Sequence, residues 1–335
     1  GEAKLHPDER LADVHRFIYH LFIDYSKRLE RIIRAAGVCS ADAPVSWDTL
    51  HEHKHKWYYP CSQAGLMTVG TYVQGPAKPD AERRRLKPGF DGFYNLSFAS
   101  VLGKPTVIYE TNTLKPDYWR ADYPMIISAF TSTHDWDGVF WYTWGDGTVR
   151  DQVDSAAYVD GGLRYAATSH QWHGIVSATD EALLASMRMA GTMFRNFAIP
   201  ATAEPVVVSV GSKDLLGGGL WVGNVDVPFP DDAPLPYKRS SALSATDFLH
   251  TVRYAFDPTR EESSLSQPLL PRIPQPCSPV EGLTYDCERG VLTVDTASAK
   301  AAVGFWGSET AFEGGLRVKL FGERAQPFAC FGMAS

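Results

Sequence analysis

A glutamate stands at the end of one of the apolar, strand-like runs of this sequence. Glu110 closes the run PTVIYE, and Asn112, a further candidate for binding a substrate, follows it. In parallel α/β folds reactive side chains gather at strand ends, where a carboxylate can act as a nucleophile. Because side chains alternate along a strand, we expect Glu110 on the same side as Thr106 and Ile108. The alternative is a buried glutamate that forms an ion pair with Arg120.

Aromatic side chains end two further strand-like runs. Trp144 ends GVFWYTW, and Tyr72 lies near the end of LMTVGTYV. An exposed indole ring can stack on the face of a sugar, and a tyrosine combines an apolar ring with a polar hydroxyl. For Tyr72 the alternative is a core tyrosine whose hydroxyl is satisfied elsewhere.

Trp47 and Asp48 end an earlier run, APVSWD, and could line a binding subsite. The alternative is a tryptophan packed in the core, followed by an aspartate that forms a turn. His51, His53 and His55 alternate in the tract HEHKHKW. We interpret this tract as a solvated loop and predict no metal ion, because no partner groups that would orient such ligands can be identified.

Strand-like and helical segments alternate over the first 200 residues. Apolar residues at three- and four-residue steps predict the helices, and runs rich in β-branched and aromatic residues predict the strands. The predicted helices are residues 8–36, 118–134 and 179–196, the last with Thr179 as its N-cap, and the predicted strands are residues 43–48, 66–73, 105–111 and 138–144. Such alternation indicates a parallel sheet. No phosphate-binding glycine motif follows a strand, which favours a barrel over a nucleotide-binding sheet.

The pattern changes beyond Pro200. Short runs of alternating apolar and polar residues are separated there by Gly and Pro, without helical periodicity between them. We therefore predict two domains: an α/β domain in residues 1–200 and a β-rich, sandwich-like domain in residues 201–335.

The segment GKPTVIYETNTLKPDYWRADYPMIISAFTSTHDWDGVFWYTW resembles strands seven and eight of clan-A glycoside hydrolases. These are retaining (β/α)8-barrel glycosidases that include β-galactosidases and cellulases. The resemblance is good over Phe98–Gly147 and looser over Leu11–Tyr72. It implies that residues 1–200 are the C-terminal half of such a TIM-type barrel. It also implies that Glu110 is the nucleophile, that Trp144 forms the floor of the sugar subsite, and that Tyr72 hydrogen-bonds the nucleophile.

A retaining glycosidase needs a second carboxyl group about 5–5.5 Å from the nucleophile. In the family this group is the Glu of an Asn-Glu pair, and the sequence contains no such pair. We expect the acid/base outside this sequence, in the remainder of the barrel upstream or in another chain; Glu2 is the alternative. The predicted reaction is cleavage of a β-glycosidic bond in an oligo- or polysaccharide by double displacement. The alternative is a non-catalytic carbohydrate-binding or scaffold protein.

Composition restricts the partners. The net charge is −7, and the one basic run, Arg83 to Arg85, is short, which argues against nucleic acid. No apolar run approaches the roughly 20 residues of a membrane span. No cofactor motif is found, and we predict no cofactor. The five cysteines include no CxxC pair; Cys277 and Cys287 could form a disulfide or remain thiols, and the compartment stays open.

Overall fold

The computed structural model describes residues 8–48, 50–51, 57–74, 96, 99–114, 117–142, 180–216, 251–267, 276–286, 288–305, 309–320 and 328–334. The helices are α1 (Asp8–Ala35), α2 (Tyr58–Cys61), α4 (Tyr123–Thr133), α8 (Glu181–Arg195) and α9 (Ser212–Leu216), with 3-10 turns η4 (Arg120–Asp122) and η7 (Glu313–Gly315). The strands are β1 (Leu50–His51), β2 (Met67–Gln74), β3 (Thr106–Leu114), β4 (Gly138–Trp141), β5 (Val206–Val210), β6 (Val252–Phe256), β7 (Ser264–Leu265), β8 (Cys277–Val280), β9 (Leu283–Asp286), β10 (Val291–Asp295), β11 (Ala299–Gly304), β12 (Glu309–Ala311), β13 (Arg317–Lys319) and β14 (Ala329–Ala334).

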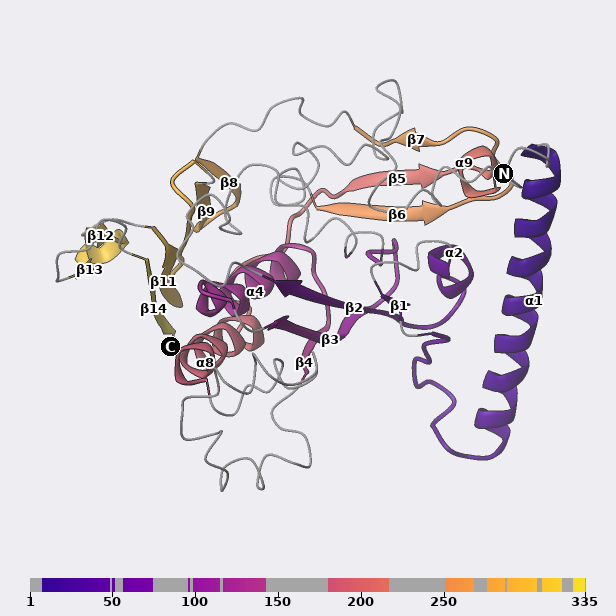
Figure 1. The fold of residues 1–335 in the computed structure, drawn as a ribbon, viewed down its shortest axis with the longest axis horizontal. Coiled ribbons are helices and arrows are strands. Elements are labelled where there is room, and N and C mark those ends of the chain that lie inside the picture. Colours follow the sequence, from indigo (N-terminus) through magenta and orange to yellow (C-terminus); the bar gives the residue numbers. More distant parts are fainter. Residues whose placement is uncertain are drawn as a thin grey trace.

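Four parallel strands form the sheet in the middle of the molecule (Figure 1). Their order in the sheet, β1-β2-β3-β4, is their order in the sequence, and each pairs in parallel with the next. Parallel neighbours need a crossover connection; α2 lies between β1 and β2 in the chain, and α4 lies between β3 and β4. Each strand is therefore added beside the one before it, as in simple βα units.

The helix ends follow from local sequence. Gly37, which follows α1, has a φ of +68°, a left-handed conformation that glycine adopts without steric cost. α8 begins after Asp180, whose Oδ1 accepts a hydrogen bond from the backbone N–H of Leu183 at 3.1 Å. The predicted N-cap, Thr179, is therefore wrong by one residue. A carboxylate is well suited to this position because it also complements the positive end of the helix dipole.

α4 is enclosed almost completely, since every residue of this helix except Ser132 is buried. Its sequence, YPMIISAFTST, has no charged residue, and Pro124 fits the first turn because its missing N–H has no partner there in any helix. Trp136, which follows the helix, is 4% exposed and belongs to the hydrophobic core. In the part of the chain that the structure describes, no helix combines the length and apolarity needed to cross a membrane.

The residues beyond 200 contribute further sheets. β5 pairs in parallel with β6 and antiparallel with β7, and the short helix α9 follows β5. Five antiparallel strands form a separate sheet in the order β14-β11-β10-β9-β8, and β12 and β13 form a hairpin. This antiparallel sheet lies at one end of the molecule and α1 at the other (Figure 1). Buried side chains form one cluster that includes Ile108 of β3, Val208 of β5 and Leu292 of β10. The division near residue 200 stays a prediction.

A buried polar cluster joins the end of α4 to β6. Arg253 of β6 donates one hydrogen bond to the backbone carbonyl of His134 and another, at 3.0 Å, to Ser100 Oγ. Trp136 Nε1 donates to the same hydroxyl oxygen at 3.0 Å. A cation stabilises the carbonyl end of a helix, so Arg253 caps α4 from a distant part of the chain.

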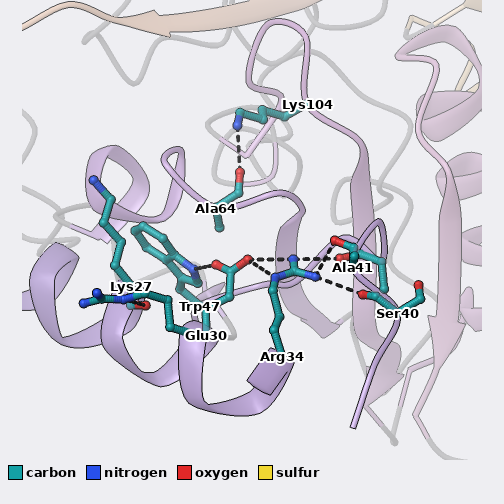
Figure 2. Close-up of polar contacts among 10 residues, drawn as sticks. Lys27, Glu30, Arg34, Ser40, Ala41, Trp47, Ala64 and Lys104 are labelled. Atoms are coloured by element: carbon teal, nitrogen blue, oxygen red, sulfur yellow. Dashed lines mark hydrogen bonds and ion pairs between the residues drawn. The ribbon is translucent and has the colours of Figure 1, made fainter. Parts of the chain in front are cut away.

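The strand predicted at residues 43–48 is wrong, because this segment is irregular and β1 begins only at Leu50. The guanidinium of Arg34 explains the difference. It donates hydrogen bonds of 2.8–3.0 Å to the carbonyl oxygens of Ser40, Ala41 and Ala43. These carbonyls wrap around a side chain of α1 (Figure 2), so they are not available for a strand ladder.

Candidate functional site

Tyr72, in the carboxyl-terminal half of β2, meets Glu110, the middle residue of β3. The Tyr72 hydroxyl donates a hydrogen bond to Glu110 Oε1. The strand register explains the contact: Gly70 lies opposite Glu110 and Tyr72 opposite Asn112, so Tyr72 is one pleat further along the same face. Both side chains are half-buried. β3 continues to Leu114, so the prediction that Glu110 closes its strand is wrong.

A β-bulge determines which way Glu110 points. Ile108 pairs with Val69 and Glu110 pairs with Gly70, so Tyr109 is an extra residue with no counterpart in β2. The pairing of β3 with β4 shows a shift at the same place. An extra residue interrupts the alternation of side chains along β3. The side chains that follow it therefore lie on the face opposite to the one that strict alternation predicts. The prediction that Glu110 shares a side with Ile108 is wrong for this reason.

Glu110 faces away from α4. The next residue, Thr111, has its Oγ1 2.6 Å from the Tyr123 hydroxyl of α4. Trp141, which pairs with Thr111, contacts the same Tyr123 ring, with ring centroids 5.6 Å apart. Because neighbouring residues of a strand point to opposite faces, Glu110 and Phe140 share the face that α4 does not cover. Phe140 is 63% exposed there.

Gly70 allows the bulge to form beside the carboxylate. A Cβ atom at Gly70 would lie 2.9 Å from the Tyr109 ring, closer than two such groups can pack. The Tyr109 ring therefore lies over the backbone of Gly70, next to Glu110. A glycine inside a strand typically marks a bulge or a place where another group approaches the backbone closely. Gly70 could therefore have indicated the bulge, but neither Gly70 nor Tyr109 was predicted.

Asn112 lies deeper than a substrate-binding residue should. It is 1% exposed, and its Nδ2 donates a hydrogen bond of 2.8 Å to the Tyr142 carbonyl. The backbone N–H of Tyr142 in turn donates to the Thr111 carbonyl at 3.0 Å. Asn112 therefore joins β3 to the segment after β4, and its role in binding a substrate stays a prediction.

Trp47 is held by α1 (Figure 2). Its Nε1 donates to Glu30 Oε2 at 2.8 Å, and Arg34 donates to the other oxygen of Glu30 at 2.6 and 2.9 Å. The hydrogen bond from Trp47, followed by that from Arg34, lowers the pKa of the Glu30 carboxyl. The backbone carbonyl of Asp48 accepts a hydrogen bond of 2.7 Å from Thr68 Oγ1. These contacts are structural, and subsite roles for Trp47 and Asp48 stay predictions.

The ion pair that would have given Glu110 a structural role is not formed. Arg120 pairs instead with Asp180, the N-cap of α8, and its Nη1 donates to the Asp117 carbonyl at 3.2 Å. Among the described residues, the one polar contact of the Glu110 carboxylate is the hydrogen bond from Tyr72. The hydrogen bond from Tyr72 uses Oε1 of the carboxylate and leaves its other oxygen, Oε2, available.

Several predicted residues lie outside the described part of the chain. These are Trp144, Glu2, His53, His55 and Cys287. Their roles stay predictions, as does the acid/base. Among the residues that are described, no group of three or more His, Cys, Asp or Glu side chains is arranged to hold a metal ion.

Two cavities lined by described residues lie away from this pair. One of about 450 Å³ lies between α4, β4 and α8, and its lining includes Ile127 and Trp141. It lies beside β4, at the edge of the parallel sheet, and its lining includes Phe140 as well. Another of about 610 Å³ lies between η4, α8 and β14, beside Met189 and Phe331. Neither is lined by the Tyr72 and Glu110 side chains, so we do not place the candidate site in either.

No protein-family model, no curated protein and no solved structure matches this chain. Any function therefore has to be argued from the site itself.

Proposed function

We propose that this protein is a retaining glycosidase with Glu110 as its nucleophile. The observation that carries the proposal is the hydrogen bond from the Tyr72 hydroxyl to Glu110 Oε1. A carboxylate nucleophile is oriented when a donor holds one oxygen and leaves the other to attack the anomeric carbon. The engagement of Arg120 with Asp180 supports the same role, because a closed ion pair with Glu110 would block that oxygen.

The parallel sheet is compatible with the second half of a (β/α)8 barrel. Sequential parallel strands joined by helices are the units of such a barrel; α2 and α4 lie in two of the connections, and Tyr72 and Glu110 lie in adjacent strands, β2 and β3. In this proposal residues 201–335 form an accessory domain that is rich in β-structure. The remaining strands come from the rest of the barrel, upstream or in another chain.

The proposed reaction has two steps. First, Glu110 Oε2 bonds to C1 of the sugar as the bond from C1 to the leaving oxygen breaks, and an acid protonates that oxygen. Then the residue that acted as the acid, now a base, removes a proton from water. The water attacks C1, and the bond from C1 to Glu110 breaks and releases the carboxylate. Tyr72 holds Oε1 in both steps. We place the acid/base outside the described residues, about 5–5.5 Å from Glu110.

A labelling experiment tests the nucleophile without requiring the acid. A 2-deoxy-2-fluoro β-glycoside with a dinitrophenolate leaving group, which departs without protonation, traps the glycosyl ester on the attacking carboxylate. We expect peptide mass spectrometry to find the sugar on Glu110. Glu110→Gln should not be labelled and should lower kcat/KM for an aryl glycoside by on the order of 10³-fold or more. Tyr72→Phe should be labelled about 10²-fold more slowly, since one oriented donor is lost.

The matched control is Glu204→Gln, which removes an exposed carboxylate outside the parallel sheet and should change neither rate. A Glu110→Gln protein that cleaves at the wild-type rate would refute the proposal. Equal sugar binding by wild-type and Glu110→Gln in calorimetry, with no label and no hydrolysis in either, would show a non-catalytic carbohydrate-binding protein instead.

A further inference from the structure

Helix α1 has an inner face that packs on the rest of the chain. His15 Nδ1 lies 2.7 Å from the Leu216 carbonyl of α9, and the Tyr19 hydroxyl donates to the Leu215 carbonyl at 3.2 Å. Further along the helix, the Phe22 and Trp57 rings lie 4.9 Å apart. These contacts account for one side of the helix only.

A different side of α1 presents large apolar residues to solvent. We call this set the outer stripe: Val14, Phe17, Leu21, Tyr25, Leu29 and Ile32, each 40–67% exposed. Steps of three and four residues place them along one side of the helix over about 27 Å. Figure 1 shows α1 at the edge of the molecule, with a long side turned away from the other elements. A contiguous exposed apolar surface of this kind marks an interaction site.

The positions of the outer stripe are spaced symmetrically about its centre. Val14 and Ile32, Phe17 and Leu29, and Leu21 and Tyr25 are pairs that lie at equal distances on either side of position 23. In a twofold dimer each residue i contacts a residue j whose own copy contacts i, so a dimer surface must be self-complementary in this way. We propose that the outer stripe of α1 binds the outer stripe of a second copy of this chain, with the two helices antiparallel and crossing at position 23.

The layers of this helix pair follow a coiled-coil pattern. Steps from Val14 to Ile18, Leu21, Tyr25, Arg28 and Ile32 alternate four and three residues, as in the seam between paired helices. In the antiparallel register Ile18 lies opposite Arg28, whose aliphatic stem covers it while the charge reaches water. A parallel pair would place Arg28 against its own copy, which like-charge repulsion disfavours.

Charge and area support the antiparallel second copy. The first half of α1, residues 8–21, has three acidic and two basic side chains, whereas residues 22–35 have two acidic and four basic ones. Antiparallel pairing sets the more acidic half beside the more basic half and opposes the two helix dipoles. The exposed fractions of the six side chains of the outer stripe add up to more than three fully exposed side chains. This is roughly 600–700 Å² of surface, at ~200 Å² for each side chain. A stable interface uses about 800 Å² per partner, which the flanking side chains complete.

Sedimentation equilibrium of the wild-type chain tests the dimer directly. We expect a mass of twice 37.0 kDa in the micromolar range. Leu21→Glu combined with Tyr25→Glu should give a monomer, because four carboxylates would meet at the twofold axis. Phe197→Glu, at an exposed phenylalanine away from α1, is the control and should leave the dimer intact. Circular dichroism must show that all variants keep their folded spectrum.

Cysteine cross-linking tests the direction of the helices. Mixed Val14→Cys and Ile32→Cys chains should form a disulfide identified by peptide mass spectrometry, and Val14→Cys alone should not cross-link through position 14. A wild-type monomer, a dimer that survives the double glutamate variant, or a disulfide between two copies of Val14→Cys would each overturn the proposal. None of these measurements depends on glycosidase activity.

Discussion

Protonation of His134 should destabilise this protein in mild acid. His134 is completely buried at the end of α4, and its Nδ1 lies 2.8 Å from the Phe130 carbonyl. Nε2 is buried and has no hydrogen-bond partner among the described residues. Burial lowers the pKa of His134 to about 3, and the nearby Arg253 guanidinium also lowers it, although the Phe130 carbonyl opposes the change.

The sign and size of the effect follow from linkage. The unfolded chain binds a proton at this residue below pH 6.5, whereas the folded protein does so only near pH 3. The contribution of His134 to the free energy of unfolding is therefore fully present above pH 6.5. It falls by about 1.4 kcal/mol per pH unit as the pH drops from 6.5 towards 3. At pH 4.5 the loss attributable to His134 is about 2.7 kcal/mol.

Urea unfolding of wild type and His134→Phe between pH 4.5 and 7.5 measures this loss. The Phe ring cannot titrate, and the Phe130 carbonyl keeps its backbone hydrogen bond from residue 134. At pH 7.5 we expect the variant to be about 1 kcal/mol less stable, because one side-chain hydrogen bond is lost. At pH 4.5 it should be the more stable protein by about 1–2 kcal/mol. Carboxylates titrate in both proteins and cancel in the difference, and His20→Gln controls for loss of an exposed histidine. A difference between wild type and His134→Phe that does not change with pH would refute the reasoning.

Two further substitutions test the structural contacts. Trp47→Phe should lower the free energy of unfolding by about 1–2 kcal/mol, because the Glu30 carboxylate loses a donor, while sugar binding stays unchanged; weakened binding with unchanged stability would favour the subsite role. Gly304→Ala should cost more than about 3 kcal/mol, since φ is +116° and the new Cβ would lie 2.0 Å from the Gly290 carbonyl oxygen. Gly191→Ala, in α8 with nothing within 4 Å of the new atom, is the matched control and should stabilise by up to about 1 kcal/mol; equal urea midpoints for the two alanine variants would contradict this account.

Much of the fold was predictable where local periodicity decides the structure. The spacing of apolar residues predicts α1, although most of those residues are exposed, and the β-branched runs predict β2, β3 and β4. The contact between Tyr72 and Glu110 was expected from the family resemblance, and the two side chains do form this hydrogen bond.

The remainder depended on side-chain contacts that apolar periodicity does not encode. The strand predicted at residues 43–48 fails because Arg34 binds the carbonyl oxygens of Ser40, Ala41 and Ala43, at and just before the start of the segment. Apolar periodicity also does not encode the contact of Arg253, which caps α4 from more than a hundred residues away. The orientation of Glu110 failed for a different reason: strict alternation was assumed along β3, and Gly70, the signal for a bulge, lies in the neighbouring strand.

The bulge at Tyr109 makes the position of the Glu110 carboxylate depend on the register of β3 against β2. A substitution at Tyr109 changes what lies beside the carboxylate but leaves the strand register as it is. Without the bulge, Tyr109 would pair with Gly70 and Glu110 with Thr71, and the carboxylate would turn towards α4. The Tyr109 ring leaves no room for a side chain at Gly70, so in any related chain a larger residue at this position of β2 would be a stronger sign of a lost site than the replacement of a side chain beside the carboxylate.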